Sequence, residues 1–140
     1  MNSKINYPQI SVLIATRNRC AMLKHCLDAI VAQNYPKRLL DLIIFDDAGT
    51  DSTAEEIPKY IQAFGANIFF KSIFLRNPEN LGVAASHRLL GEKISPESKM
   101  VLYIDDDAYL AYDCLKNLVE YMLQNPDVGI IGPRIVLAKD

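Results

Sequence analysis

Residues 9–31 read QISVLIATRNRCAMLKHCLDAIV, and the spacing of their apolar residues changes partway along. The first part, Gln9–Ala15, is a short apolar run rich in β-branched residues, which is typical of a buried strand. The second part has apolar residues at helical spacing, at Leu23, Cys26, Leu27, Ile30 and Val31. The stretch therefore predicts a strand that is followed directly by an amphipathic helix.

The same alternation continues along the rest of the chain. Short apolar runs predict four more strands, at Leu42–Phe45, Ile68–Leu75, Val101–Ile104 and Val128–Ile131. Helical spacing recurs at Ile57–Phe64, Val83–Ile94 and Leu115–Leu123. Strands that alternate with helices pair in parallel through crossover connections, so we expect a three-layer α/β/α sandwich with a mainly parallel sheet.

The helix at 57–64 has a signal at its start and an irregularity inside it. Ser52 and Glu55 have the spacing of a capping box, in which each side chain bonds to the backbone N–H of the other residue. Pro58 lacks the N–H that a helix interior uses, so it predicts a kink or a late start.

The composition describes an ordinary globular domain. The chain has 140 residues, of which 50% are hydrophobic and 23% charged, so residues 1–140 fit one domain with a sizeable core. A net charge of -2 without a basic block gives no electrostatic reason to bind nucleic acid or anionic lipid. Three cysteines without metal-ligand spacing indicate reduced core residues, and no apolar stretch reaches the roughly 20 residues of a membrane-spanning helix.

Polar loops follow four of the predicted strands. They read TRNR at 16–19, DDAGTD at 46–51, RNPENLG at 76–82 and DDD at 105–107. Turn and cap residues explain any one of these loops. In a parallel sheet, however, ligands bind outside the carboxyl ends of the strands, where all four loops are expected to meet. The loops therefore predict a binding site, although the chain has neither the dinucleotide G-x-G-x-x-G nor a P-loop.

The acidic triplet indicates what that site binds. Adjacent carboxylates repel one another unless water or a cation screens them, and Mg²⁺ or Mn²⁺ binds carboxylates together with substrate phosphates. Because side chains alternate along a strand, we expect Asp105 and Asp107 to act together and Asp106 to point elsewhere, provided that the strand extends that far. Asp47 can accept a hydrogen bond from an N–H group of uracil, thymine or guanine.

Four sequence blocks carry a resemblance to a known family. They are ISVLIATRNR, LIIFDDAGTDST, NPENLGVAASHR and VLYIDDDAYL, in this order. Together they resemble the nucleotide-binding half of the family 2 glycosyltransferases, which have the Rossmann-like A-type glycosyltransferase fold. The resemblance covers about residues 9–140. It implies transfer of a sugar, with inversion, from a UDP-, dTDP- or GDP-linked donor to a glycan, lipid or protein acceptor, with Mg²⁺ or Mn²⁺ as cofactor.

The resemblance also assigns roles to single residues. It places the base on Asp47, the ribose on Asp105 or Asp106, and the metal on Asp107 with Asp105. The nucleotide-binding set that it implies is Ala15, Thr16, Arg17, Asn18, Asp47, Asn80, Gly82, Arg88, Asp105 and Asp106. Two blocks depart from the family pattern. Arg17 stands where an aromatic ring is frequent, and its guanidinium plane can stack on a base. His87 and Arg88 stand where Arg and Asn are common, and we interpret His87 as an ordinary helix residue.

Enzymes of this family have a second half that binds the acceptor and supplies an Asp or Glu general base. We therefore expect the catalytic base to lie beyond Asp140. The chain would then be the donor-binding part of a cytoplasmic protein, with peripheral attachment to the membrane as an alternative for the full-length molecule. A nucleotide-sugar-binding module that does not transfer, or an inactive fragment, is the alternative function. A phosphoacceptor receiver domain and an Asp-x-Asp phosphatase fit poorly, because their acidic residues belong nearer the start of the sheet.

Overall fold

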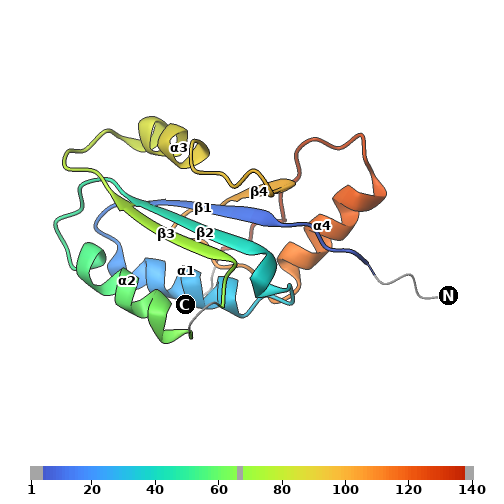
Figure 1. The fold of residues 1–140 in the computed structure, drawn as a ribbon, viewed down its shortest axis with the longest axis horizontal. Helices are drawn as coiled ribbons and strands as arrows, with labels where there is room; N and C mark the ends of the chain where they lie inside the picture. The colour runs from blue at the N-terminus through green and yellow to red at the C-terminus, as the bar shows by residue number, and fades with distance from the viewer. Residues whose placement is uncertain (1–4, 66–67, 138–140) are drawn as a thin grey trace.

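The computed structural model describes residues 5–65 and 68–137 (Figure 1). Its strands are β1 Ile10–Thr16, β2 Leu40–Asp46, β3 Lys71–Arg76 and β4 Met100–Tyr103. Its helices are α1 Cys20–Val31, α2 Thr53–Ala63, α3 Val83–Gly91 and α4 Cys114–Gln124, and a short 3₁₀ helix, η1 Lys37–Leu39, precedes β2. All strand pairs are parallel, in the order β3-β2-β1-β4.

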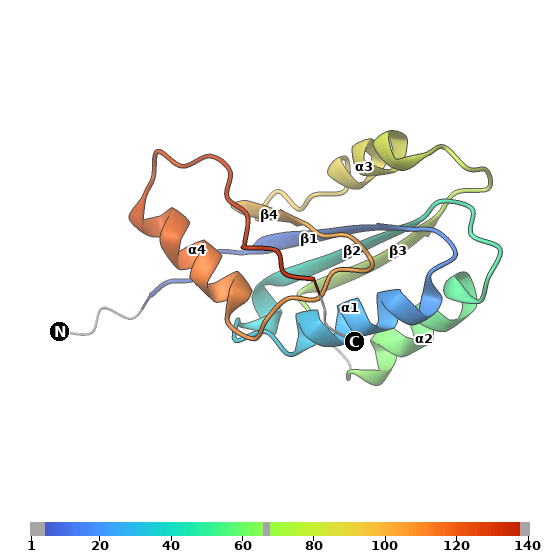
Figure 2. The same ribbon diagram turned by 180° about the vertical axis from the view of Figure 1, so that it is seen from behind.

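Helices cover both faces of this sheet. Figures 1 and 2 show α1 and α2 on one face and α3 on the other, so the predicted three-layer parallel architecture is confirmed. The side chains of the inner strand β1 alternate between the two faces of the sheet and pack against the helices on both. Val12 and Ile14 belong to the larger hydrophobic cluster with α1, whereas Leu13 packs in the smaller cluster with Leu90 of α3.

The strongest helix predictions match the buried faces. In α1, Leu23, Cys26, Leu27 and Ile30 of the predicted stripe have no exposed surface, and Val31 at its end is partly buried. In α4, Leu115 and Val119 join the same large cluster. Their burial removes apolar surface from water, which is the main term that holds these helices on the sheet. Among the helices of the described ranges, none combines the length and the apolarity that crossing a lipid bilayer requires.

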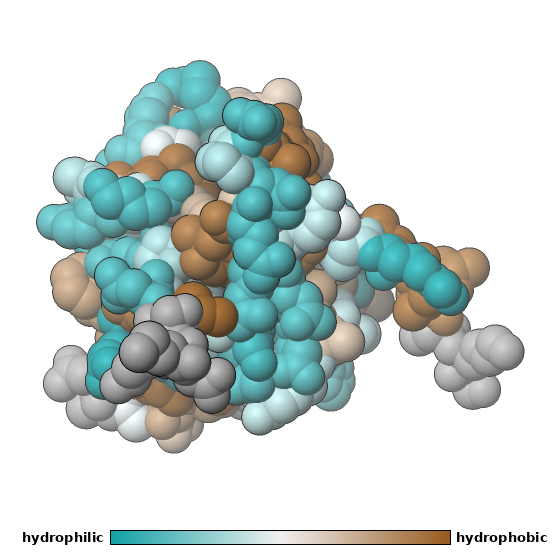
Figure 3. Space-filling view, turned by 90° about the vertical axis from the view of Figure 1, so that its right-hand side faces the viewer, coloured by the Kyte–Doolittle hydropathy of each residue, from teal (hydrophilic) through white to brown (hydrophobic). Residues whose placement is uncertain are grey.

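The predicted fifth strand is wrong. Residues 128–131 are in no strand, and the sheet of the described residues has four strands. A strand exists only through hydrogen bonds to a partner, and an apolar sequence does not specify that partner. Without one, the side chain of Ile130 is 93% exposed. Figure 3 likewise shows hydrophobic residues at the surface among hydrophilic ones.

The boundaries of α2 and β3 also differ from the prediction. The capping box does not form: Ser52 precedes α2 but makes no side-chain cap, and the carboxylate of Asp51 instead accepts a hydrogen bond from Thr53 N at 3.1 Å. The helix begins at Thr53 and contains Pro58, so the predicted late start is wrong. β3 begins at Lys71 rather than Ile68, because its pairing with β2 begins at the Asp41 and Lys71 register.

Candidate functional site

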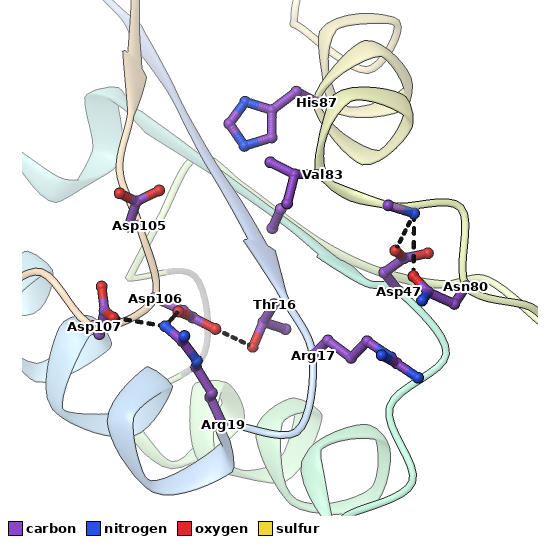
Figure 4. Close-up of a pocket in the computed structure, with 12 residues that line it drawn as sticks. Thr16, Arg17, Arg19, Asp47, Asn80, Val83, His87, Asp105, Asp106 and Asp107 are labelled. Atoms are coloured by element: carbon purple, nitrogen blue, oxygen red, sulfur yellow. Dashed lines mark hydrogen bonds and ion pairs between the residues drawn. The ribbon is translucent and has the colours of Figure 1, made fainter.

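A pocket of about 440 Å³ opens at the carboxyl ends of β1, β2 and β4, below the start of α3 (Figure 4). Parallel pairing brings the polar loops after these strands to one edge, as the sequence predicts. The residues that line the pocket are Ala15, Thr16, Arg17, Arg19, Asp47, Asn80, Gly82, Val83, His87, Asp105, Asp106 and Asp107. Nine of these belong to the predicted nucleotide and metal residues. Their binding roles stay predictions.

The turn after β2 fixes Asp47 through backbone contacts. Ala48 has a φ of 56°, which reverses the chain directly after Asp47. The two carboxylate oxygens of Asp47 accept hydrogen bonds from Leu81 N and Gly82 N, each at 2.8 Å, and the residue is only 5% exposed. A carboxylate has about four lone-pair sites, so Asp47 can tie down the loop before α3 and still accept from a ligand.

Asp46, the last residue of β2, holds the inside of the same turn. It is fully buried, and its Oδ1 accepts a hydrogen bond from Gly49 N at 2.9 Å. A Cβ on Gly49 would lie 2.6 Å from that oxygen, so this position has no room for a side chain. Arg76 of β3 adds an ion pair to Asp46 at 3.4 Å and a hydrogen bond to the carbonyl of Gly49 at 2.7 Å. The turn is therefore closely packed around its acidic residue.

The acidic triplet lies in a turn and not on a strand. β4 ends at Tyr103, and Ala108 N donates to the carbonyl of Asp105 at 3.1 Å. The strand on which the prediction depended therefore does not reach the triplet. Asp105 and Asp107 are nevertheless exposed, whereas Asp106 is buried, and the predicted joint action of Asp105 and Asp107 stays a prediction. The thiol of Cys26 lies below the turn and donates to the carbonyl of Asp105 at 3.6 Å.

Burial first, and then the nearby negative charges of Asp106, Asp107 and Asp105, together raise the pKa of Cys26 to about 12. The thiol consequently stays protonated at neutral pH and acts as a donor in the floor of the turn. This explains why a cysteine beside three carboxylates is a packing residue and not a nucleophile.

A guanidinium group joins Asp106 to Asp107. Arg19 Nη1 lies 3.1 Å from Asp106 Oδ1 and 2.6 Å from Asp107 Oδ2 (Figure 4). The other oxygen of Asp106 accepts from Thr16 Oγ1 at 2.7 Å. The two carboxylates, Asp106 foremost, raise the pKa of Arg19 above its ordinary value, so this cation stays charged. The turn after β4 is thus balanced by a positive side chain from the loop after β1.

Sequence reasoning missed three residues of the pocket: Arg19, Val83 and His87. The ring of His87 stacks on Tyr103, with centroids 5.5 Å apart and an interplanar angle of 9°. Helical periodicity could have placed Val83 and His87 on one face of α3, four residues apart. The polar loop at 16–19 placed Arg19 near the site, but no local signal gave the direction of its side chain, which depends on the positive φ of 57° at the preceding Asn18.

Two predicted residues do not line the pocket. The side-chain oxygen of Asn18 accepts from Thr50 N at 2.6 Å and ties the loops after β1 and β2 together. Arg88 is exposed on α3 and pairs with Glu92, one helical turn further on. Their predicted contacts with a nucleotide stay predictions. Arg17 does line the pocket, but Figure 4 shows its side chain pointing away from the acidic triplet.

The residues of the turn after β4 can bind a divalent cation if a ligand supplies the rest of its coordination. Carboxylate oxygens are the ligands that Mg²⁺ and Mn²⁺ prefer, and the bridging Arg19 shows that Asp106 and Asp107 already hold positive charge. Within the described ranges, no group of three His, Cys, Asp or Glu residues is placed to chelate an ion by itself. The turn therefore suits a metal whose remaining ligands come from elsewhere, such as the phosphates of a ligand.

Comparisons with known proteins identify the family. Residues 11–138 match the family model described as Glycosyl transferase family 2. A poly(ribitol-phosphate) beta-glucosyltransferase of Bacillus spizizenii is 26% identical over 124 residues, covering 89% of this chain and 19% of that protein. An uncharacterized glycosyltransferase of Haemophilus influenzae is 29% identical over 122 residues, covering 86% of this chain and 45% of that protein. The chain thus spans less than half the length of these relatives.

Solved structures share the fold. The mannosyltransferase PcManGT of Pyrobaculum calidifontis, in complex with GDP-Man and Mn²⁺, aligns with a TM-score of 0.75 at 24% identity. That alignment covers 84% of this chain and 33% of PcManGT. Residues 1–349 of Staphylococcus aureus TarS, in complex with UDP-GlcNAc, align with a TM-score of 0.73 at 21% identity, covering 84% of this chain and 32% of that 1–349 chain. The chain therefore has the A-type glycosyltransferase fold.

Proposed function

Because the chain belongs to glycosyl transferase family 2, we propose that its pocket binds a nucleotide-diphospho-sugar, together with Mg²⁺ or Mn²⁺, for transfer of the sugar to an acceptor. The observation that carries the proposal is the meeting of Asp47 and the Asp105–Asp107 turn in one pocket. These groups offer an acceptor for a base at one side and charged oxygens for a metal and a diphosphate at the other.

In this proposal, different residues of the pocket bind different parts of the donor. Asp47 accepts an N–H of the base, which favours uracil, thymine or guanine; complexes of fold neighbours with GDP-Man and UDP-GlcNAc support such a donor. Asp105 or Asp106 holds the ribose, and Asp107, with Asp105 beside it, holds the metal. Arg17 and Asn80 border the base side.

The diphosphate then lies near the turn after β4, with its sugar toward the open side of the pocket. When bound, a divalent cation supplies positive charge that stabilises the departing diphosphate. The acceptor hydroxyl attacks the anomeric carbon from the opposite side, the bond from that carbon to the diphosphate breaks, and the configuration is inverted, while a general base takes the proton of the hydroxyl. The residues of this chain bind and orient the donor for that attack.

A thermal-shift screen tests donor binding. UDP, dTDP, GDP, ADP and their sugar conjugates are added at millimolar concentration, each with Mn²⁺ or with chelator. Ligand at about 100 times its dissociation constant stabilises the native state by about 2.7 kcal/mol, which raises the melting temperature by several degrees. We expect a pyrimidine or guanine nucleotide to give the largest shift, and only with Mn²⁺. Equal shifts for all four nucleotides would contradict the role of Asp47.

The same samples separate an enzyme from a binding module. A transferase that holds its donor in a reactive geometry releases free sugar slowly by transfer to water, whereas a module leaves the donor intact. Release of UDP or GDP from the best donor, measured over hours, would favour the enzyme. Tight binding with no release, both by this chain and by a longer form that carries an acceptor-binding half, would favour the nucleotide-sugar-binding module.

A further inference from the structure

The Arg19 guanidinium joins Asp106 to Asp107, and Asp107 is a carboxylate to which the proposed function assigns a divalent cation. We propose that Arg19 is an internal cation of this site, which balances the acidic turn while no donor is bound and which a divalent cation must displace. The inference rests on the proposed function and deepens it, since it makes loading of the metal depend on arrival of the nucleotide diphosphate.

The charge on the turn explains why an internal cation is needed. Three carboxylates follow one another, and Asp106 is only 5% exposed. A buried carboxylate is costly unless it is paired or hydrogen-bonded, and Asp106 has both a hydrogen bond from Thr16 and the charge of Arg19. Arg19 therefore supplies the positive charge that Asp106 and Asp107 need when no metal is bound.

Arg19 and a divalent cation compete for Asp107. Arg19 Nη1 is 2.6 Å from Asp107 Oδ2, and a Mg²⁺ ion on the same oxygen would lie about 2.0–2.1 Å from it. On that oxygen, and more weakly on the other oxygen of the same carboxylate, the two positive charges repel each other. The carboxylate oxygens of Asp105 accept no hydrogen bond from the described residues, so they stay available to a metal, whereas Asp107 Oδ2 is held by Arg19. Free protein should consequently bind a metal weakly.

The surroundings allow Arg19 to move. The side chains of Arg19 and Asp107 are each 48% exposed, and ion pairs at such exposure are weak, so the contact with Asp107 is the one that gives way first. A second opening of about 630 Å³ lies on the other side of Arg19, lined by residues that include Asn18, Met22, Asp51 and Asp107. The guanidinium can swing into this opening while its backbone stays at the start of α1. A diphosphate brings negative charge that attracts the metal and also offers Arg19 a new partner.

Linkage then gives a measurable consequence. If nucleotide diphosphate favours the state with Arg19 displaced, it raises the affinity for the metal, and the metal raises the affinity for the nucleotide by the same factor. Removing the charge of Arg19 should raise the affinity for the metal alone and reduce that coupling. Arg19→Met keeps a long apolar stem without the charge, and Arg19→Lys keeps the charge.

The experiment measures Mn²⁺ binding through the electron paramagnetic resonance signal of the free ion. Wild type, Arg19→Met, Arg19→Gln and Arg19→Lys are titrated without nucleotide and then with UDP or GDP. Arg38→Met is the matched control, because Arg38 is exposed in η1 at the opposite end of β2. Thermal melting checks that each variant folds. If Arg19→Met does not fold, Arg19→Gln takes its place.

We expect Arg19→Met to bind Mn²⁺ without nucleotide at least about fivefold more tightly than wild type, the lower end of typical coupling between ligands, and to gain less from UDP or GDP. Arg19→Lys and Arg38→Met should resemble wild type. Equal or weaker Mn²⁺ binding by Arg19→Met, or no Mn²⁺ binding by any variant, would overturn the role of Arg19. The titration with Mn²⁺ alone contains no nucleotide, so it tests the role of Arg19 independently of donor binding. Failure of donor binding would appear instead in the nucleotide screen.

Discussion

Asp47 and Asp107 reach the same pocket from two turns, and these turns hold their acidic residues through different kinds of partner. After β2, the carboxylate that faces the pocket is held, among the described residues, by the backbone alone: Asp47 accepts hydrogen bonds from Leu81 and Gly82. Asp46 behind it accepts from Gly49 and also pairs with the side chain of Arg76. After β4, Asp106 and Asp107 share the side chain of Arg19. A backbone amide cannot leave without moving its loop, whereas an exposed side chain can exchange with another cation. The first turn is consequently a fixed wall, and the second is adjustable.

The strongest test of this contrast is Asp47→Ala. The change removes the acceptor of two N–H groups before α3, and hydrogen bonds to a charged acceptor are stronger than average. We expect the free energy of unfolding to fall by about 2–3 kcal/mol in urea denaturation. Asp47→Asn retains one acceptor oxygen and should lose roughly half as much. A loss below about 0.5 kcal/mol would show that water replaces the carboxylate, and that this wall is as adjustable as the other.

The same variant tests the base pocket by a second measurement. Calorimetric titration should show that Asp47→Ala weakens UDP or GDP by about 1–3 kcal/mol more than it weakens pyrophosphate, because only the nucleotides carry a base. Pyrophosphate is the internal control for the acidic turn. Equal losses for both ligands would instead indicate a general change in charge.

A smaller effect on stability is expected for Gly49→Ala. The new Cβ would lie 2.6 Å from Asp46 Oδ1 and 3.3 Å from Asn18 N, so the turn after β2 has to shift. Overpacking of this kind costs about 1–3 kcal/mol, and we expect the lower half of that range because the turn lies at the edge of the sheet. Gly129→Ala is the control, since a Cβ there meets nothing within 4 Å. Equal unfolding midpoints for the two variants would show that the first turn is not closely packed.

The sequence predicted the fixed parts of the molecule better than the adjustable ones. Apolar spacing identified β1, β2, β4 and the four helices, because burial dictates those residues locally. It also predicted a strand at 128–131, where pairing depends on a partner that no local pattern specifies. Parallel topology then brought Asp47 and Asp107 to one pocket without any further assumption.

Within the site, a local rule was extended beyond the end of the strand. Strand alternation was the reason to separate Asp106 from Asp105 and Asp107, but β4 stops at Tyr103, and the exposed Asp105 and Asp107 and the buried Asp106 lie in a turn. The bridging Arg19 could not be predicted either, since its direction depends on the positive φ of Asn18 and on contacts far away in the sequence. Long flexible side chains at loop ends are thus the least predictable part of such a pocket.

Asp107→Asn should leave the fold nearly unchanged while altering the function of the second turn. Asp107 is 48% exposed, and its loss removes one of three mutually repelling charges, so we expect the unfolding free energy to change by less than about 0.5 kcal/mol. Binding of UDP or GDP should no longer respond to Mn²⁺ in calorimetric titrations with metal or with chelator. Asp106→Asn is the contrast, because its buried carboxylate bonds to Thr16 and Arg19, and this variant should be the less stable of the two. An undiminished response to Mn²⁺ in Asp107→Asn would mean that the turn does not hold the metal.

The smallest expected effect concerns the pH dependence of the first turn. Asp51 ends the loop after β2; burial alone would raise its pKa, but hydrogen bonds from Thr53 and from the backbone N–H of Cys20 lower it below its ordinary value of 3.8. A lowered pKa contributes stability that is present above the unfolded value and is lost as the pH falls through the folded value. Urea midpoints of wild type should therefore drop more steeply below about pH 4 than those of Asp51→Asn, while Asp127→Asn, on an exposed residue, should follow wild type. Because Asp51 is mostly exposed, the difference should be small. Parallel curves for wild type and Asp51→Asn would mean that the amide of Cys20 does not depend on this carboxylate, and that the first turn is fixed by Asp46 and Asp47 alone.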